Sequence, residues 1–531
     1  MRGALTGTLT ILRSLMRQDG RSFAPWILLA TLLTTSSVLV YPWVFPDLEA
    51  RQAFAMAVGA NPTVGIIFGP ASDLLTADGF NVWRSLALGG FLAALGAIFA
   101  VTRDTRGQED SGQAELVASN PVGRGSQLAA AVLFALSGSL LVGVVAGVLT
   151  VPFGGAWEPS LLVGATFTAT GWMFTAVAAV AAQVGADKRT ASSLAVGFLG
   201  ALFLARGFAY ALDAPSWTIW VNPLGWMTET RPVTENNWWP LLLAVGFTVL
   251  ALTLAFALRS RRSFGFGILP PRPGPDRGRT RGLLGLTLRL NAGTILTWSF
   301  AFVILGLVFG QFSKSVPDLL SKDVGLAGFL AAGALTPTDI MGAFLATVLG
   351  LIGIIASVSG VQVMLRMRSG EMEGRSDPLL AEPVSRRTYF ARNVFVALAL
   401  SGTILLIAGV LVAAIAANGA LGVTFGEAFF QSVVTIPATW VVVALSTTVV
   451  GARPRVPLAA WAGVVLSFAL TFLGPTFNLW DWILGISPFW HVPGVTEGAP
   501  DWSGLWWLGL AVVLLASVGF VGYQRRDIAR T

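Results

Sequence analysis

The chain has 531 residues, of which 54% are hydrophobic and only 11% charged, against about 25% charged in an ordinary soluble domain. This composition excludes a soluble globular protein, and the aromatic share of 11% excludes a disordered chain as well. The absence of cysteine and the single histidine exclude disulfides and thiolate metal sites. We therefore expect an all-α polytopic membrane protein with no metal site.

The first 23 residues predict an amphipathic helix at the membrane interface rather than a signal peptide, because no small-residue cleavage site follows a short apolar region. Its basic residues and its apolar stripe are Arg2, Arg13, Arg17 and Arg21, and Leu5, Leu9, Leu12, Leu15 and Met16.

Twelve apolar stretches follow, each about 20 residues long and so able to cross ~30 Å of hydrocarbon as a helix. They are predicted at residues 24–44, 82–102, 128–152, 160–183, 192–212, 239–258, 291–312, 341–364, 393–416, 429–450, 457–475 and 505–523.

The basic residues set the predicted orientation. With the N-terminus inside, only six of the 34 Lys and Arg residues fall in spans or outer segments, and the positive-inside rule therefore predicts that both termini are cytoplasmic. The six are Arg51, Arg84, Arg206, Arg231, Lys314 and Lys322.

The segments after the second and eighth spans repeat one pattern at a constant offset of 262 residues. Six of seven aligned pairs are identical and the seventh exchanges one carboxylate for another. The pairs are Arg106 and Arg368, Glu109 and Glu371, Gly112 and Gly374, Glu115 and Asp377, Pro121 and Pro383, Val122 and Val384, and Arg124 and Arg386.

This repeat predicts two six-span halves. Because six is even, both copies enter the membrane in the same orientation, which gives parallel repeats. The first half with its interfacial helix is residues 1–258, and the second is residues 291–531. Between them, residues 259–290 form a basic, Pro-rich cytoplasmic linker with a second interfacial helix, whose surface suits anionic membrane lipids.

Each repeated loop is expected to be an exposed, short polar helix that ends at Pro121 or Pro383, with Ser385 as the N-cap of the following span. The central Gly112 and Gly374 suggest that another backbone approaches closely. The alternative is a solvated loop whose charges only determine the membrane topology. However, membrane topology depends on Lys and Arg and does not require a fixed spacing of Glu, Gly and Pro.

The sequence has no P-loop that could bind ATP, and few charged residues lie inside its predicted spans. A phosphate-binding P-loop needs a lysine after glycine, and Lys188, Lys314 and Lys322 do not follow glycine. Arg206 is the one charge well inside a predicted span. It could extend outward to the membrane surface or pair with Asp213, and its role is either structural anchoring or a part in the transport pathway.

The outer loops before the last span of each half predict a gate. Eleven of the 19 tryptophans lie in these two regions, which an ordinary interfacial belt would partly explain. Each loop also contains a turn, at Asn222-Pro223 or Ser487-Pro488, which suggests short helices that dip back into the membrane. We hypothesise that these turns meet and close the exit, with gate residues Pro223, Leu224, Trp226, Pro488, Phe489 and Trp490.

The repeated pattern, with Arg103-Asp104-Thr105-Arg106 and the run from Leu379 to Arg386, resembles the coupling loops of ATP-binding-cassette exporter permeases of the second type, the type V fold. The fused two-half form is similar to exporters of polyketide antibiotics and mycobacterial multidrug efflux permeases. The first loop departs from the family at Gln113, Asn120 and Gly123, so one half could couple less strongly.

The resemblance implies a permease that expels lipophilic or amphipathic compounds through a bacterial cytoplasmic (inner) membrane. It also implies two copies of a separate nucleotide-binding ATPase subunit, which would bind ATP and Mg, while this chain would hold no cofactor, bind no nucleic acid and not itself be an enzyme. The alternatives are an ion-coupled secondary transporter and a membrane enzyme for lipid-linked substrates. The enzyme would need a catalytic base, and His491, near Glu497 and Asp501, has no convincing partner set.

Overall fold

The computed structural model describes residues 3–59, 62–212, 214–262, 267–268, 282–322, 337–418, 423–473, 480–496 and 500–526. Every element among these residues is helical, and eleven helical segments are long and apolar enough to cross a membrane. The chain is thus an all-helical, multi-pass membrane protein, divided into two compact units at residues 1–274 and 275–531.

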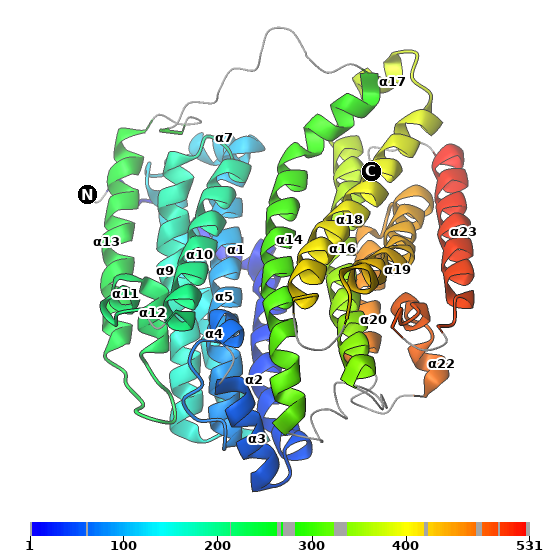
Figure 1. Cartoon of the computed structure of the whole chain (residues 1–531). Helices are drawn as coiled ribbons and strands as arrows, with labels where there is room; N and C mark the ends of the chain where they lie inside the picture. The colour runs from blue at the N-terminus through cyan, green and yellow to red at the C-terminus, as the bar shows by residue number, and fades with distance from the viewer. Residues whose placement is uncertain are drawn as a thin grey trace. The chain divides into compact units, whose positions relative to one another are not determined.

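The first unit is built on six long helices that pack against one another (Figure 1). These are α2 (Ala24–Val44), α5 (Ala77–Thr102), α8 (Ser126–Thr150), α9 (Trp157–Val184), α10 (Lys188–Ala211) and α13 (Pro240–Arg261). Its short elements are α1 (Thr8–Asp19), η1 (Gly20–Phe23), α3 (Leu48–Gly59), α4 (Pro62–Phe68), η2 (Arg103–Gly107), α6 (Gln108–Asp110), α7 (Gln113–Ala118), η3 (Val151–Phe153), α11 (Trp217–Val221) and α12 (Pro223–Thr228).

The second unit has five long helices: α14 (Gly282–Lys322), α16 (Pro337–Met372), α18 (Arg386–Ala416), α19 (Phe425–Ala452) and α23 (Ser503–Arg525). Its shorter elements are α17 (Asp377–Ala381), η4 (Pro457–Trp461), α20 (Ala462–Phe468), η5 (Ala469–Leu473), α22 (Asp481–Leu484) and η6 (Pro488–His491).

Eleven of the twelve predicted spans coincide with these long helices. At the twelfth, expected at 457–475, the structure describes an apolar helical segment from Pro457 that continues through η5 to Leu473, and residues 474 and 475 lie outside the described residues. Pro457 opens a 3₁₀ turn, and the helix widens into a π-helical turn at η5. The described part of this segment is therefore an irregular helix that joins a 3₁₀ turn, an α-helical turn and a π-helical turn.

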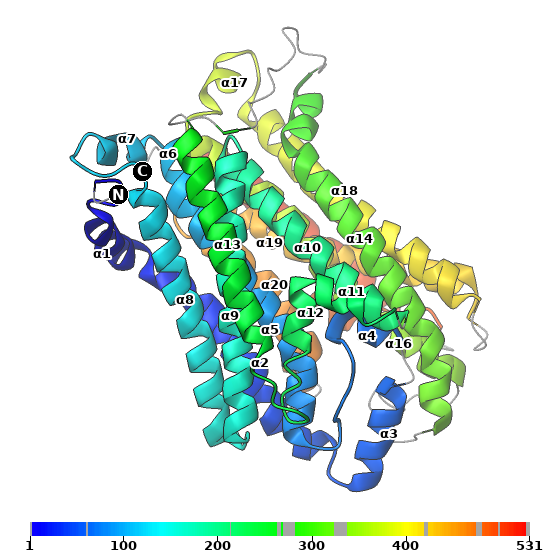
Figure 2. The same ribbon diagram turned by 90° about the vertical axis from the view of Figure 1, so that its left-hand side faces the viewer.

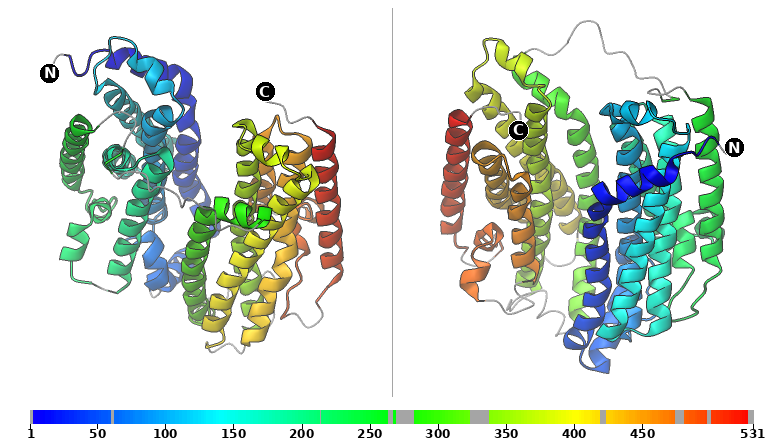
Figure 3. Two further views of the ribbon diagram at one scale, coloured as in Figure 1. Left: turned by 90° about the horizontal axis from the view of Figure 1, so that it is seen from above. Right: turned by 180° about the vertical axis from the view of Figure 1, so that it is seen from behind.

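The N-terminal segment forms α1, which packs on α8 and crosses the long helices at a steep angle (Figure 3). Leu15 is buried, whereas Leu9 is 65% exposed. An exposed apolar face beside basic residues is what a membrane interface accommodates.

The predicted linker is helical at both ends, because α13 continues to Arg261 and α14 begins at Gly282. Residues 263–266 and 269–281 lie outside the described residues. The second interfacial helix expected before residue 291 is not a separate element: α14 is one continuous helix of 41 residues.

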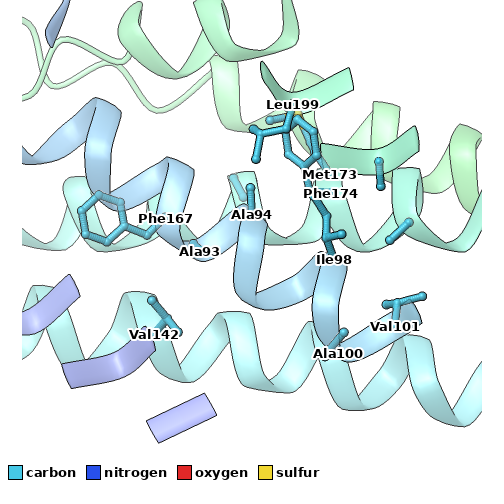
Figure 4. Close-up of a cluster of buried hydrophobic side chains, with 14 of the residues drawn as sticks. Ala93, Ala94, Ile98, Ala100, Val101, Val142, Phe167, Met173, Phe174 and Leu199 are labelled. Carbon is cyan, nitrogen blue, oxygen red and sulfur yellow. The ribbon is translucent and has the colours of Figure 1, made fainter. Parts of the chain in front are cut away.

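The core of the first unit is a cluster of small and aromatic side chains from α5, α8, α9 and α10 (Figure 4). Alanines such as Ala94 and Ala135 are fully buried in this cluster, together with large side chains such as Phe167 and Met173. Small residues let helix backbones approach closely, so that dispersion contacts between helices hold the bundle together in lipid.

The two units repeat a contact inside their helix pairs. The indole Nε1 of Trp172 on α9 donates to the carbonyl oxygen of Leu136 on α8 at 3.0 Å. The indole Nε1 of Trp440 on α19 likewise donates to Leu398 on α18 at 3.0 Å. The internal repeat therefore extends from the loop sequence to contacts within the bundles.

Candidate functional site: the repeated loops

Both repeated loops have the same backbone path. The amide of Gly112 donates to the carbonyl oxygen of Glu109 at 3.2 Å, and the amide of Gly374 donates to that of Glu371 at 3.1 Å. The short helices α7 and α17 follow. The single helix expected in each loop is therefore divided by a turn at the glycine.

The glycines are explained by backbone conformation, and the expected close approach of another backbone is wrong for the described residues. Gly112 has a φ of +75° and Gly374 a φ of +69°, a left-handed conformation in which a Cβ is unfavourable. A Cβ built on Gly112 meets nothing within 4 Å, and one on Gly374 meets only a carboxylate oxygen of Asp377 at 3.6 Å.

Glu109 lies in a buried charge cluster rather than on an exposed loop surface. Its side chain is 6% exposed, and its carboxylate accepts hydrogen bonds from Arg106 at 2.8 Å and from Arg262. Arg259 lies 3.8 Å away. Arg262 is the C-cap of α13, so the carboxylate joins the loop to the end of the last long helix of the first unit.

Glu371 makes the equivalent contact in the second unit. Its side chain is 1% exposed, and its carboxylate accepts a hydrogen bond from Arg526 at 2.7 Å. Arg526 is the C-cap of α23, and its guanidinium stacks on the ring of Tyr523. We call the contacts of Glu109 with Arg262 and of Glu371 with Arg526 the loop ion pairs.

The first arginine of each repeated pattern, Arg106 or Arg368, donates a hydrogen bond to a backbone carbonyl at or just after the end of another long helix of its unit. Arg106, 1% exposed, donates through Nε to the carbonyl oxygen of Ala182 at 2.6 Å, at the end of α9. Arg368 donates through Nε to the carbonyl oxygen of Pro454 at 3.2 Å, just after α19. Each loop is thereby bonded to two other parts of its own unit.

The other predicted coupling residues differ in exposure. Glu115, Pro121, Arg124, Asp377 and Pro383 are exposed. Arg386 is half-buried and donates to the carbonyl oxygen of Arg526 at 3.3 Å. Ser385 caps α18 by accepting from the amide of Thr388 at 3.2 Å, as predicted. The candidate coupling residues thus divide into a buried set that holds the loop and an exposed set on its surface.

The departure from the family pattern at Gly123 has a local cause. The amide of Gly123 donates to the carbonyl oxygen of Thr6 at 2.9 Å, and a Cβ on Gly123 would lie 2.3 Å from the backbone of Ala4. The first loop therefore requires glycine here because the N-terminal segment lies against it.

The sequence analysis did not identify Arg262 and Arg526 as partners of the loop glutamates. It also did not identify Leu116, whose side chain is 73% exposed on α7. The two arginines are 264 residues apart, close to the repeat offset of 262, and each follows the last apolar stretch of its half. That spacing could have indicated the two arginines. Leu116 could not be found in this way, because the position 262 residues later holds a different residue, Pro378.

The outer loops also repeat a local structure. The side chain of Asn222 accepts from the amide of Leu224 at 2.9 Å, and the side chain of Ser487 accepts from the amide of Phe489 at 3.3 Å. α12 packs on α13, and α11 packs on α10 and α12; all four helices are labelled in Figures 1 and 2. Both outer loops thus contain short helices, and whether these helices enter the membrane stays a prediction.

The predicted gate residues are mostly buried in their own units. Pro223 and Leu224 belong to the buried face of α12, and Phe489 contacts the second unit's helices. Trp226 and Pro488 are half-buried, whereas Trp490 is 50% exposed. His491, the only histidine, pairs with the carbonyl oxygen of Gly485 at 2.8 Å.

Arg206 is buried, at 4% exposure. It donates to the carbonyl oxygen of Ile67 at 2.9 Å and lies 3.5 Å from the hydroxyl of Thr228. Its guanidinium stacks on Phe203. It therefore connects α10 to α4. Its expected partner, Asp213, lies outside the described residues.

Comparison with known proteins agrees with this architecture. A family model for the C-terminal domain of the multidrug efflux system permease Rv1217c matches residues 52–258 and 281–524. The multidrug efflux system permease protein Rv1217c of Mycobacterium tuberculosis is 34% identical over 541 residues, covering 98% of this chain and 95% of that protein. The chain therefore belongs to the family of multidrug efflux permeases.

Proposed function

We propose that the chain is the permease subunit of an ATP-driven exporter of lipophilic or amphipathic compounds in the inner membrane of a bacterium. Two copies of a separate nucleotide-binding subunit would bind ATP and Mg and dock onto the repeated loops. The halves would be parallel six-helix repeats, with both termini in the cytoplasm. The observation that carries the proposal is that both loops share one fold and one ion pair to the end of the last helix.

The contacts of each loop give a route for force. The exposed α7 and α17 would receive the movement of the ATPase subunits. Arg106 and Arg368 would transmit this movement to the ends of α9 and α19. The loop ion pairs would transmit it to the ends of α13 and α23. Because buried ion pairs and packed helices have few alternative arrangements, a small displacement of the loop moves whole helices.

The loop ion pairs are better suited to transmission than to docking. A carboxylate that is 1% or 6% exposed has no free surface for a partner subunit. The docking surface is instead the exposed set, which includes Glu115, Leu116 and Asp377. Interfaces gain most from such apolar anchors surrounded by polar residues.

The test is to express the chain with a candidate ATPase encoded beside it and to weigh the purified complex by native mass spectrometry. We expect one permease chain and two ATPase subunits. In proteoliposomes, efflux should then require ATP and persist with a protonophore. A fully active particle containing this chain alone, or efflux that follows the proton gradient without ATP, would replace the proposal with the ion-coupled carrier.

A further inference from the structure

The first unit contains an apolar cavity of about 370 Å³ between α8, α9 and α13, three helices that are labelled in Figure 2. This volume lies within the roughly 300 to 1,000 Å³ typical of small-molecule sites. The cavity is near the ends of these helices that the charge pattern assigns to the outside. Its walls include Gly143, Val144, Ala165, Thr168, Trp172 and Trp238.

The cavity follows from the way in which α8 and α9 cross. A Cβ on Gly143 would lie 2.1 Å from the carbonyl oxygen of Gly164, and a Cβ on Gly164 would lie 2.3 Å from the carbonyl oxygen of Gly143. Small residues allow such a close approach of backbones in membrane helices. Because the two glycines have no side chain and the neighbouring Ala165 has a short one, the space between the crossing and α13 stays open.

The polar side chains in the wall of the cavity already have partners. The hydroxyl of Thr168 donates to the carbonyl oxygen of Gly164 at 3.2 Å, and the indole Nε1 of Trp172 donates to the carbonyl oxygen of Leu136. Apart from Trp238 at the outer end, the other residues that line the cavity are apolar. A buried water needs two to four polar partners, so this wall suits an apolar occupant and not water.

The cavity is open along the surface of the unit. Leu140, Val144 and Val245 line it and are 44%, 48% and 40% exposed. They belong to helices that are long and apolar enough to cross a membrane, so this surface faces hydrocarbon. Trp238 and Trp239 are half-exposed at the outer end, where tryptophan rings lie at the level of lipid headgroups. The cavity is therefore continuous with the surface that the protein shares with the bilayer.

We propose that this cavity binds one acyl chain of a phospholipid from the outer leaflet, with the headgroup of that lipid near Trp238. An empty space of this size would forfeit dispersion contacts along its wall, and the chains of the bilayer are the apolar groups that surround it. The lipid would be a resident component of the first unit, held between α8, α9 and α13. This binding does not depend on ATP-driven export, so it is separate from the proposed function.

The site is expected in the first unit only. The indole hydrogen bonds of Trp172 and Trp440 align α9 with α19 at an offset of 268 residues. At this offset, three wall residues correspond to larger ones: Leu161 to Phe429, Ala165 to Val433 and Thr168 to Ile436.

The side chain of Ile436 shows where this extra volume lies. Its Cγ2 is 3.7 Å from the position of a Cβ on Gly402, and Gly402 corresponds to Leu140 at the loop offset of 262. Larger side chains of α19 thus take the place that the first unit leaves open.

Photolabelling with a lipid tests the proposal. The full-length chain is reconstituted with phosphatidylethanolamine that carries a diazirine in the middle of one acyl chain, and labelled peptides are identified by mass spectrometry after irradiation. A held chain stays beside the same atoms, so we expect labelling at the cavity to exceed that of Leu296 and Phe300 on α14 at least ~5-fold. These two residues are 70% and 65% exposed and serve as the reference for passing lipid. Equal labelling would overturn the proposal.

Variants that exchange residues between the units locate the site. Leu161→Phe combined with Ala165→Val gives the wall the residues of the second unit, and should reduce labelling at the cavity to the level of α14. Leu133→Phe, at a residue 42% exposed on α8 outside the cavity, is the matched control and should change nothing. Thermal unfolding checks that each variant is folded.

The reverse exchange adds no volume and therefore stays informative if the first variant fails to fold. Phe429→Leu combined with Val433→Ala should raise labelling of α18 and α19. Unchanged labelling in both exchanges would contradict the proposal.

The outcomes distinguish other occupants and keep the two proposals separate. If the cavity is not labelled and an organic extract of the purified chain contains a lipophilic compound that is not a phospholipid, that compound fills the cavity and the proposal is wrong. Since labelling is measured without ATP or an ATPase subunit, its failure leaves the proposed function unaffected. Efflux that proceeds without ATP would likewise leave this site in place.

Discussion

The carboxylate of Glu371 lies 2.7 Å from the guanidinium of Arg526, although 155 residues separate them in the chain. Glu109 makes the same contact with Arg262 across 153 residues. In both units a repeated loop is thereby joined to the residue that caps the last long helix. This relationship makes the loops part of each bundle's structure.

The first prediction concerns the stability of this pair. Glu371→Ala should destabilise the protein by about 3–5 kcal/mol, because it leaves the cation of Arg526 without its carboxylate in a nearly buried place. Thermal unfolding in detergent measures the effect. The matched control is Glu373→Ala, whose carboxylate pairs with Arg375 on the surface and should cost only about 0–1 kcal/mol.

A charge exchange sharpens the test. Glu371→Arg combined with Arg526→Glu should recover part of the stability that either single change removes. If the Glu371→Ala protein unfolds at the wild-type temperature, the loop ion pair does not hold the second unit together.

The second prediction concerns the loop glycines. Because Gly112 is constrained by its φ and not by neighbouring atoms, substitutions should follow backbone preference: Asn should be tolerated best, Ala should cost about 1–2 kcal/mol, and Val more. ATP hydrolysis by the assembled complex and thermal unfolding are the measurements. A penalty that follows side-chain volume, with Asn worse than Ala, would point instead to a close contact in the complex.

The sequence predicted much of this structure because lipid imposes a simple rule on length and polarity. Hydropathy did not reveal that the described part of residues 457–475 is an irregular helix, with a 3₁₀ turn that begins at Pro457 and a π-helical turn at η5. The sequence also placed Glu109 and Glu371 on an exposed surface, because their partners are more than 150 residues away and pairing at that separation leaves no local signal.

The third prediction tests docking on the exposed part of the first loop. Leu116→Asp should reduce copurification of the ATPase subunit at least ~10-fold while leaving thermal unfolding of the permease unchanged, because Leu116 is 73% exposed and contributes little to the fold. Leu9→Asp, at a residue 65% exposed on α1, is the control for the loss of an exposed leucine and should leave the complex intact. Full recovery of the ATPase subunit with Leu116→Asp would exclude α7 from the interface.

The last prediction concerns the outer gate, which the chain's lack of cysteine makes accessible to crosslinking. If the two outer turns meet in the resting exporter, cysteines at the exposed Val221 and Trp490 should crosslink and block efflux until the bond is reduced. Cysteines at Leu224 and Phe489 should crosslink poorly, because both side chains are buried in their own units, at 7% and 8% exposure.

Two measurements test this prediction. One is the yield of crosslinked chain on a gel after limited proteolysis of the linker, and the other is efflux before and after reduction of the disulfide. Efflux that continues at the wild-type rate through a fully crosslinked Val221→Cys and Trp490→Cys protein would mean that these turns do not close the exit.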